Sequence, residues 1–310
     1  MLSPIRVYKG EQFPLFSTIS VEIGARCNRH CVFCPNHDNR RPNAFMTWDM
    51  ITKQADELAS LNYRGSWGPF IYNEPLKDPR ILEIIRMMRE RVPRCVINLN
   101  TNTDYLTEEM LDELFDAGVN QLACNIYSSR DGHDDPDVVA KGVRIAKARA
   151  KEVQQWLDDR SYIDQKSSLY TGGSPRKTIA KVQHKYGVDE SGANFGGGFG
   201  FTNRAGNVAW LAGDETAPQQ YSGVCTKPFR IMQINWTGDC ILCCNDYHGV
   251  TNYGNLKTHT LIEMWNSIEL NRERAHLQVG ERVGLCASCD YKGGAYKHMI
   301  HPVVLERKAK

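Results

Sequence analysis

The sequence predicts an α/β fold with parallel strands, followed by a smaller, cysteine-rich C-terminal region. Strand-like and helix-like segments alternate through the first half of the chain, which is the pattern of repeated βαβ units. In such folds the loops at the carboxyl ends of the strands bear the reactive groups. The cysteines gather in CxxxCxxC, CxxCC and CxxC units. We therefore expect a barrel-like α/β domain and a small second domain.

The first two strand–helix pairs follow from the periodicity of apolar residues. Residues 18–23 alternate polar and apolar side chains, as a half-buried strand does. Residues 48–61 have apolar side chains at helical spacing, with Thr47 as the N-cap. A short apolar run predicts a strand at 68–72. An apolar stripe that follows a proline predicts a helix at 80–91.

The next elements continue the alternation. We expect a third strand at 95–100 and a helix that begins at Thr107 and ends at Gly118. A fourth strand is predicted at 121–127, and a helix with a basic face at 138–157.

The rest of the chain is less regular. The polar, glycine-rich stretch 161–200 receives no assignment. We expect a strand within 199–207, another at 231–236, and a helix at 261–271.

Composition places the chain among folded globular proteins. Of its 310 residues, 41% are hydrophobic and 24% charged. A formal net charge of +2 gives no case for binding nucleic acid or a membrane surface. Apolar residues near the N-terminus are interrupted by charges and prolines, unlike a secretory signal. Clustered cysteines indicate metal ligation in a reducing compartment, so we expect a cytoplasmic protein.

The most informative motif is the CxxxCxxC triplet formed by Cys27, Cys31 and Cys34, just after the first predicted strand. Three thiolates on one short loop can hold three corners of a cubic [4Fe-4S] cluster and leave the fourth iron open. The alternative is a structural zinc loop, which usually has four closing ligands.

This triplet, at this position, resembles that of the radical S-adenosylmethionine (SAM) enzymes. The resemblance implies a partial (β/α)6 TIM-like barrel, here residues 1–212, followed by a small C-terminal α+β auxiliary iron–sulfur domain. It also implies that the open iron chelates the amino and carboxylate groups of SAM. One electron, from a reduced flavodoxin or ferredoxin, then cleaves SAM to methionine and a 5'-deoxyadenosyl radical, which abstracts hydrogen from the substrate.

The resemblance also suggests which residues contact SAM. Glu74 lies where a Gly-Gly-Glu-like motif of the family accepts hydrogen bonds from the SAM ammonium. Asn73 replaces a glycine of that motif. The alternative role of Glu74 is a surface carboxylate beside a turn. Asn125 lies near the end of the fourth predicted strand, where members of the family often have a Ser or Asn that contacts SAM. Phe33 resembles the residue that packs near the SAM adenine, and its alternative role is ordinary hydrophobic packing. The expected SAM contacts are Phe33, Asn73, Glu74, Asn100, Asn102 and Asn125.

A second cysteine system lies in the C-terminal third. Its spacing resembles the auxiliary-cluster domain known in its short form as the Twitch domain, here residues 213–310. The longer SPASM form would need cysteines beyond Cys289, so we expect one auxiliary [4Fe-4S] cluster. Cys240 and Cys244 are not needed as ligands. They are either buried side chains that act as small apolar residues, or a hydrogen-atom donor or alternative cluster ligand. The four expected ligands are Cys225, Cys243, Cys286 and Cys289.

Among Twitch-containing enzymes the chain resembles the SAM-dependent aminocyclitol dehydrogenase of butirosin biosynthesis. The resemblance implies oxidation of a polar small-molecule alcohol, such as a sugar or aminocyclitol, with the auxiliary cluster accepting an electron. Arg204 precedes the first auxiliary cysteine and is the candidate for contacting substrate hydroxyls, with a structural salt bridge as its alternative. Tyr127 and His133 are the candidates for accepting the hydroxyl proton.

Two other functions stay open. One is a peptide (RiPP) maturase that forms a crosslink or epimerises a residue; epimerisation would need a hydrogen-atom donor such as Cys240 or Cys244. The other is a non-enzymatic iron–sulfur electron carrier, in which an open-iron triplet would have no use.

Overall fold

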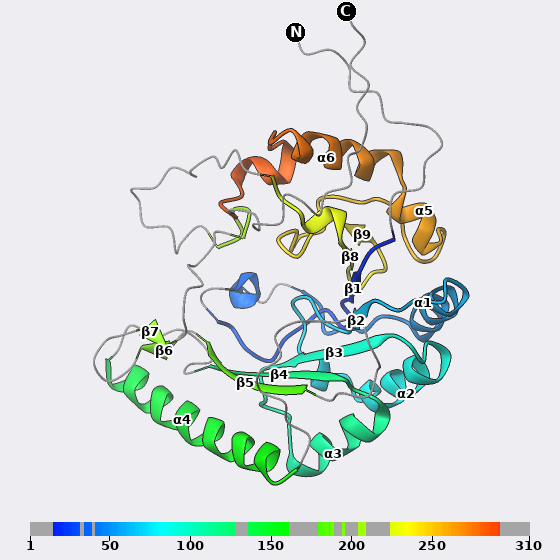
Figure 1. Ribbon diagram of the computed structural model, residues 1–310. Coiled ribbons are helices and arrows are strands. Elements are labelled where there is room, and N and C mark those ends of the chain that lie inside the picture. The colour runs from blue at the N-terminus through cyan, green and yellow to red at the C-terminus, as the bar shows by residue number, and fades with distance from the viewer. Residues whose placement is uncertain are drawn as a thin grey trace, which may run out of the picture. The chain divides into compact units, whose positions relative to one another are not determined.

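The computed structural model describes residues 15–31, 34–38, 41–127, 136–160, 179–185, 187–188, 194–195, 204–208 and 224–291. The chain forms two compact units (Figure 1). The sheet unit is Val21–Gly200, and the tail unit combines Met1–Ser20 with Phe201–Lys310. Strand β1 (Thr18–Val21) leads the chain from the tail unit into the sheet unit.

The sheet unit is built on parallel strands, as the sequence predicts. Strands β2 (Ser66–Gly68), β3 (Val96–Thr101), β4 (Gln121–Tyr127) and β5 (Ile179–Lys185) are neighbours in that order, and each adjacent pair is parallel. A separate antiparallel pair follows, formed by β6 (Gly187–Val188) and β7 (Asn194–Phe195).

Helices connect successive parallel strands. After α1 (Trp48–Ser60), helix α2 (Ile81–Arg91) joins β2 to β3, α3 (Glu108–Ala117) joins β3 to β4, and α4 (Pro136–Asp158) joins β4 to β5. Helix α2 packs between α1 and α3, and α4 packs on β4 and β5. Figure 1 shows α2, α3 and α4 along one side of β3–β5, so their apolar stripes and one face of the sheet form the core.

Local sequence explains where these helices begin and end. The Thr47 side chain accepts a hydrogen bond from the Met50 N–H, and Thr107 does the same from Met110, so both predicted N-caps are confirmed. Helix α3 ends at Gly118, whose φ of +118° favours glycine. The predicted strand at 121–127 is confirmed without change.

The tail unit is a small mixed unit. Its strands β8 (Ile231–Ile234) and β9 (Cys240–Ile241) are antiparallel. Helices α5 (Leu261–Trp265) and α6 (Ile268–Gln278) follow them. Short 3-10 turns at Lys227–Phe229 (η4) and Gly284–Ser288 (η5) complete the unit, whose core includes an edge-to-face contact between the rings of Phe16 and Trp265 at 5.3 Å.

Two predicted elements are wrong in detail. The strand expected at 68–72 ends at Gly68, because Asn73 closes the following residues into a loop: its side chain donates to the Pro69 carbonyl and accepts from the Ile71 N–H. The single helix expected at 261–271 is two helices, because Ser267 is extended and caps α6 by accepting from the Leu270 N–H.

Helices that could cross a membrane are absent from the described part of the chain, since none there is both long and apolar enough.

Two glycine substitutions should change the free energy of unfolding in opposite directions. Gly118→Ala should destabilise the protein by about 1–2 kcal/mol, because the left-handed φ disfavours a Cβ and that Cβ would lie 2.8 Å from the Arg89 side chain. Arg89 cannot easily yield, since it donates to the carbonyls of Gly118 and Cys95. Gly142→Ala, inside α4, should stabilise by up to about 1 kcal/mol. Urea unfolding measures both; equal effects would contradict this account of the α3 terminus.

Candidate functional site

The predicted triplet lies on the loop after β1 and is tied together by its own backbone. The Cys34 N–H donates to the Cys31 carbonyl at 2.9 Å, and the His37 N–H donates to the Cys34 carbonyl at 2.9 Å. Cys31 is buried, whereas Cys27 and Cys34 are partly exposed. The three thiols thus belong to one compact loop that faces partly outward.

Electrostatics show that these thiols are neighbours. Burial, together with negative charge on Glu74 and Cys34, raises the pKa of Cys27 to about 12. The pKa of Cys31 is raised by burial and by Cys34 and Cys27. As thiols they would stay protonated and inert, and a bound metal is what would make them thiolates. In the described residues no group of three or more His, Cys, Asp or Glu is placed as it stands to hold a metal ion.

Asn102 brings a hydrogen-bond donor to the triplet from the end of β3. Its side-chain Nδ2 lies 3.4 Å from the Cys27 Sγ and 2.7 Å from the Asn28 Oδ1. Its Oδ1 accepts from the Asp104 N–H at 3.0 Å, which fixes the amide orientation. An N–H aimed at a cysteine sulfur suits a thiolate that ligates an iron–sulfur cluster, so this donor set fits the group the triplet predicts.

A buried ion pair positions the same loop. Arg29, inside the triplet, binds both carboxylate oxygens of Asp104 through Nε at 2.8 Å and Nη2 at 2.5 Å. Its guanidinium also lies 5.5 Å from the centre of the Tyr127 ring. Burial is the largest single influence and lowers the pKa of Arg29, but the Asp104 hydrogen bond, the Asp104 charge and the neighbouring cysteines together outweigh it, so its pKa is raised. Sequence reasoning missed this pair; the available signal was a charged residue between two cysteines of the triplet.

Glu74 lies at the end of β2, buried beside the same loop. Its Oε1 accepts from the Thr101 hydroxyl at 2.8 Å and the Leu76 N–H at 3.1 Å, and its Oε2 accepts from the Asn102 N–H at 2.7 Å. Burial raises its pKa to about 7, although these three donors favour the carboxylate. Glu74 is therefore not a surface carboxylate, and it joins the ends of β2 and β3.

The other predicted SAM contacts differ in how their side chains are used. Asn125 is buried at the end of β4, and its Oδ1 has no hydrogen-bond partner among the described residues. Asn73 is committed to its own loop, as described above. Asn100 is part-exposed in β3, opposite Ala123 of β4. Phe33 lies outside the described residues.

The four tail cysteines are also buried. They are 7–9% exposed, and they come from the segment before η4, the end of β9, and η5. Asn245 donates to two of them: its backbone N–H to the Cys243 Sγ at 3.4 Å and its side-chain Nδ2 to the Cys289 Sγ at 3.5 Å. This is the same kind of donor that Asn102 supplies to the triplet. The four expected ligands are Cys225, Cys243, Cys286 and Cys289.

Neighbouring charges tie this set together. Burial raises the pKa of Cys225, with negative charge on Cys289 adding to it, and raises that of Cys286 to about 12, with Cys225 and Cys289 adding to it. Burial likewise raises the pKa of Cys243, with Cys286 among the neighbours that add to it. Burial, these electrostatic interactions and the sulfur-directed donors of Asn245 suit cysteines that ligate an iron–sulfur cluster, although among the described residues these side chains are not placed, as they stand, to hold a metal ion.

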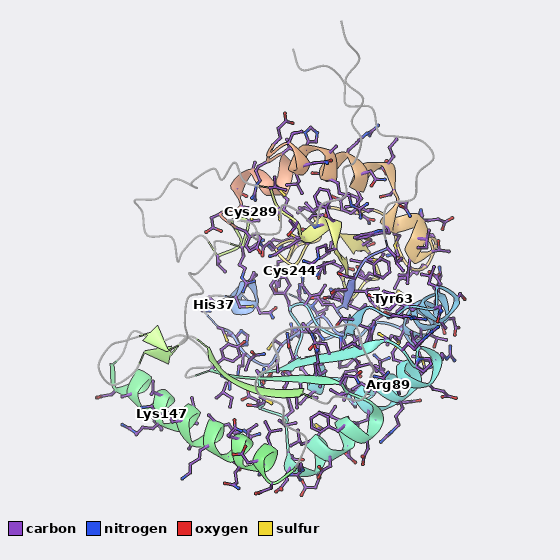
Figure 2. The ribbon with its side chains drawn as sticks, in the orientation of Figure 1. His37, Tyr63, Arg89, Lys147, Cys244 and Cys289 are labelled. Carbon is purple, nitrogen blue, oxygen red and sulfur yellow. The ribbon has the colours of Figure 1, made fainter. Side chains whose placement is uncertain are left out.

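The two spare cysteines of the tail differ from each other. Cys240 is buried in β9, where burial raises its pKa to about 12, as expected for a small apolar side chain. Cys244 is partly exposed, and its Sγ lies 3.4 Å from the Lys227 Nζ. Figure 2 labels Cys244 and Cys289, which both belong to the tail unit.

The residues predicted to act on the substrate lie in different settings. Arg204 begins a turn at 204–208, where we expected a strand. The pKa of Tyr127 is raised by burial and by Cys31, Cys34 and Cys27, so it is a neutral phenol that can donate a hydrogen bond but accepts a proton poorly. His133 lies outside the described residues.

Breaking the Arg29–Asp104 pair should loosen the triplet loop. Asp104→Asn leaves a buried guanidinium without its counter-charge, so we expect a loss of about 3–5 kcal/mol in the free energy of unfolding, together with lower iron content after reconstitution. Asp56→Asn is the matched control: it removes an exposed pair with Arg91 and should cost less than about 1 kcal/mol. Equal unfolding midpoints and iron contents for the two variants would contradict this role.

Known protein families match both parts of the chain. Residues 21–158 match the radical SAM superfamily, and residues 225–290 match SPASM, an iron–sulfur cluster-binding domain. The chain is 22% identical over 281 residues to the S-adenosyl-L-methionine-dependent 2-deoxy-scyllo-inosamine dehydrogenase of Niallia circulans, which covers 89% of this chain and 93% of that protein. It is 27% identical over 149 residues to a tungsten-containing aldehyde ferredoxin oxidoreductase cofactor-modifying protein of Pyrococcus furiosus, covering 46% of this chain and 39% of that one.

A solved structure has the same fold. The crystal structure of BtrN in complex with AdoMet and 2-DOIA superposes with a TM-score of 0.65 at 21% identity, covering 95% of this chain and 100% of that one. A second structure of BtrN, in an open conformation, gives a TM-score of 0.58 at 20% identity, covering 93% and 99%. The predicted α/β fold is thereby confirmed. The chain is a radical SAM enzyme whose second cysteine system belongs to a SPASM-type domain, and its cofactors are iron–sulfur clusters and S-adenosylmethionine.

Proposed function

We propose that this enzyme oxidises an alcohol carbon of a polar small molecule, a sugar or an aminocyclitol, in a SAM-dependent dehydrogenation. The feature that supports this most is the presence of two different cysteine sets in one chain: a triplet, whose three thiolates would leave one iron open, and a buried set of four, which would close its cluster. An open cluster suits SAM cleavage, and a closed one suits electron transfer. The likeness to a 2-deoxy-scyllo-inosamine dehydrogenase over most of both chains supports the substrate class.

The two cysteine sets can account for the hydrogen atom and the electron that the proposed oxidation removes. Conversion of a carbinol to a ketone releases one hydrogen atom from carbon, one proton from the hydroxyl group and one electron. Cys27, Cys31 and Cys34 would hold the first cluster, which with SAM and one electron from a reduced flavodoxin or ferredoxin would supply the radical chemistry that removes the hydrogen atom. The proposed role of the four-cysteine set, as a second [4Fe-4S] site, is to receive the remaining electron. The eleven cysteines, all of them among the described residues, form no disulfide, in keeping with a proposed cytoplasmic location.

Two side chains in the sheet unit are our candidates for holding SAM. The buried Asn125 Oδ1, which has no partner among the described residues, offers an acceptor to a ligand donor. The Glu74 carboxylate offers negative charge to the SAM ammonium, a charge-assisted contact. Ligand binding would satisfy the first and favour the ionised form of the second.

Arg204 is our candidate for orienting the substrate, because its planar guanidinium can bind two oxygen atoms at once. Tyr127, a neutral phenol, suits donation of a hydrogen bond and not removal of the hydroxyl proton.

SAM affinity should depend on pH through Glu74. Because burial raises the pKa of Glu74 to about 7, the carboxylate is lost as pH falls below that value, so affinity should fall about tenfold per pH unit below pH 7 and level off above it. Equilibrium dialysis of SAM with the anaerobically reconstituted protein measures this. Glu74→Gln should bind SAM weakly at every pH, whereas the exposed control Glu113→Gln should keep the wild-type profile. An unchanged profile in Glu74→Gln would exclude this role.

Turnover with a labelled substrate tests the reaction class. Reconstituted enzyme would receive SAM, dithionite and 2-deoxy-scyllo-inosamine, or a panel of related polyols, with deuterium at the carbinol carbon. We expect deuterium in 5'-deoxyadenosine and a ketone two mass units below the unlabelled alcohol. Deuterium entering an unoxidised product from deuterated solvent would instead indicate epimerisation, for which the partly exposed Cys244 thiol is a candidate hydrogen donor. A crosslinked peptide as product would indicate a maturase.

A further inference from the structure

The turn that begins at Arg204 has an unusual backbone. Arg204 and Ala205 have φ of +50° and +57°, and Gly206 follows with φ of +88°. The left-handed conformation is unfavourable for a residue with a side chain, and two such residues in succession require surrounding contacts to hold them. The turn therefore depends on its anchors.

Those anchors come from the loops that contain the expected auxiliary ligands. The Asn207 side-chain Nδ2 donates to the Arg204 carbonyl at 2.7 Å and to the Asn245 carbonyl at 2.8 Å. The Ser288 hydroxyl donates to the Ala205 carbonyl at 3.1 Å. Ser288 lies between Cys286 and Cys289, and Asn245 lies two residues after Cys243.

Asn245 extends this connection to the sulfur atoms. Its own N–H groups donate to the Cys243 and Cys289 sulfurs, while its carbonyl accepts from Asn207. One residue thus touches two expected cluster ligands on one side and the Arg204 turn on the other. Asn245 is 2% exposed, so water does not compete for these bonds.

We propose that the auxiliary cluster fixes the Arg204 turn, with Asn207, Ser288 and Asn245 as the positioning residues that connect them. Iron–thiolate bonds from Cys243, Cys286 and Cys289 would pin the two loops that contain Asn245 and Ser288, and the pinned loops would hold the left-handed turn in its one conformation. Without the cluster the anchors are free to move, and the strained turn relaxes. Substrate recognition at Arg204 then requires an assembled auxiliary cluster; this last step rests on the proposed function.

Amide hydrogen exchange tests the connection without any substrate. We would compare the reconstituted wild type with a Cys286→Ala and Cys289→Ala double variant that keeps the triplet. Exchange of the Asn207 amide, which donates to the Arg204 carbonyl, should be at least about tenfold faster in the variant, the factor expected for loss of about one net hydrogen bond. Equal exchange at 205–208 in the two proteins would overturn the proposal.

Single substitutions separate the positioning residues from general destabilisation. Asn207→Ala and Ser288→Ala should speed exchange at 205–208 while leaving the reduction potential of the auxiliary cluster unchanged. Asn245→Ala should also shift that potential to a more negative value, because an N–H donor to a ligand sulfur is lost. Asn252→Ala is the matched control: it loses two hydrogen bonds of the same unit, to Asp239 and from the Gly254 N–H, and should change neither readout. The proposal fails if the control behaves like Asn207→Ala.

Kinetics add the functional step. If the dehydrogenase assignment holds, Asn207→Ala should raise the substrate KM about tenfold with kcat nearly unchanged, the pattern of lost binding. An unchanged KM together with faster exchange would refute the recognition step alone. Absence of turnover in the wild type would refute the proposed function, and the exchange and potential measurements would still decide the structural connection.

Discussion

Burial of sulfur is the constraint on which the two sites depend. Thiols placed away from water keep their protons, as the raised pKa values of Cys27, Cys225 and Cys286 show, and protonated thiols neither ligate metal nor react. These thiols form no disulfide, and binding of a metal is what would convert them to thiolates. The ion pair of Arg29 with Asp104 and the donors around Glu74 hold the first loop in place before the metal arrives.

Each unit has an asparagine side chain that donates a hydrogen bond to a cysteine sulfur. Asn102 in the sheet unit and Asn245 in the tail unit each aim a side-chain amide N–H at a cysteine sulfur, and the Asn102 amide oxygen also accepts from the Asp104 N–H. Such a donor stabilises negative charge on the sulfur and fixes the loop that presents it. The difference lies in the number of cysteines: the triplet leaves a position for a small molecule, and the set of four does not. We infer that one asparagine serves a reactive cluster and the other an electron-transfer cluster.

Much of the fold was predictable from the sequence because the patterns that indicate helices and strands lie within short segments of the chain. The period of the apolar residues predicted the strand–helix alternation, and Thr47 and Thr107 marked helix starts. Cysteine spacing and the family resemblance predicted both ligand sets. Contacts between distant segments were not predictable in this way. Asp104 pairs with Arg29 across 75 positions, and Ser288 bonds Ala205 across 83, so neither pattern is visible within a window of sequence. The break between α5 and α6 at Ser267 was missed because the apolar residues continue at helical spacing across it, although Ser267 caps α6.

The most direct test of the account is iron and sulfide content with Mössbauer spectra on anaerobically reconstituted protein. It would be applied to the wild type, to a variant with Cys27, Cys31 and Cys34 all changed to Ala, and to one with Cys225, Cys243, Cys286 and Cys289 all changed to Ala. Two [4Fe-4S] clusters predict about eight irons in the wild type and about four in each variant, with SAM altering the spectrum only where the triplet is intact. About four irons in the wild type, with zinc in the tail unit, would contradict the account by removing the electron acceptor.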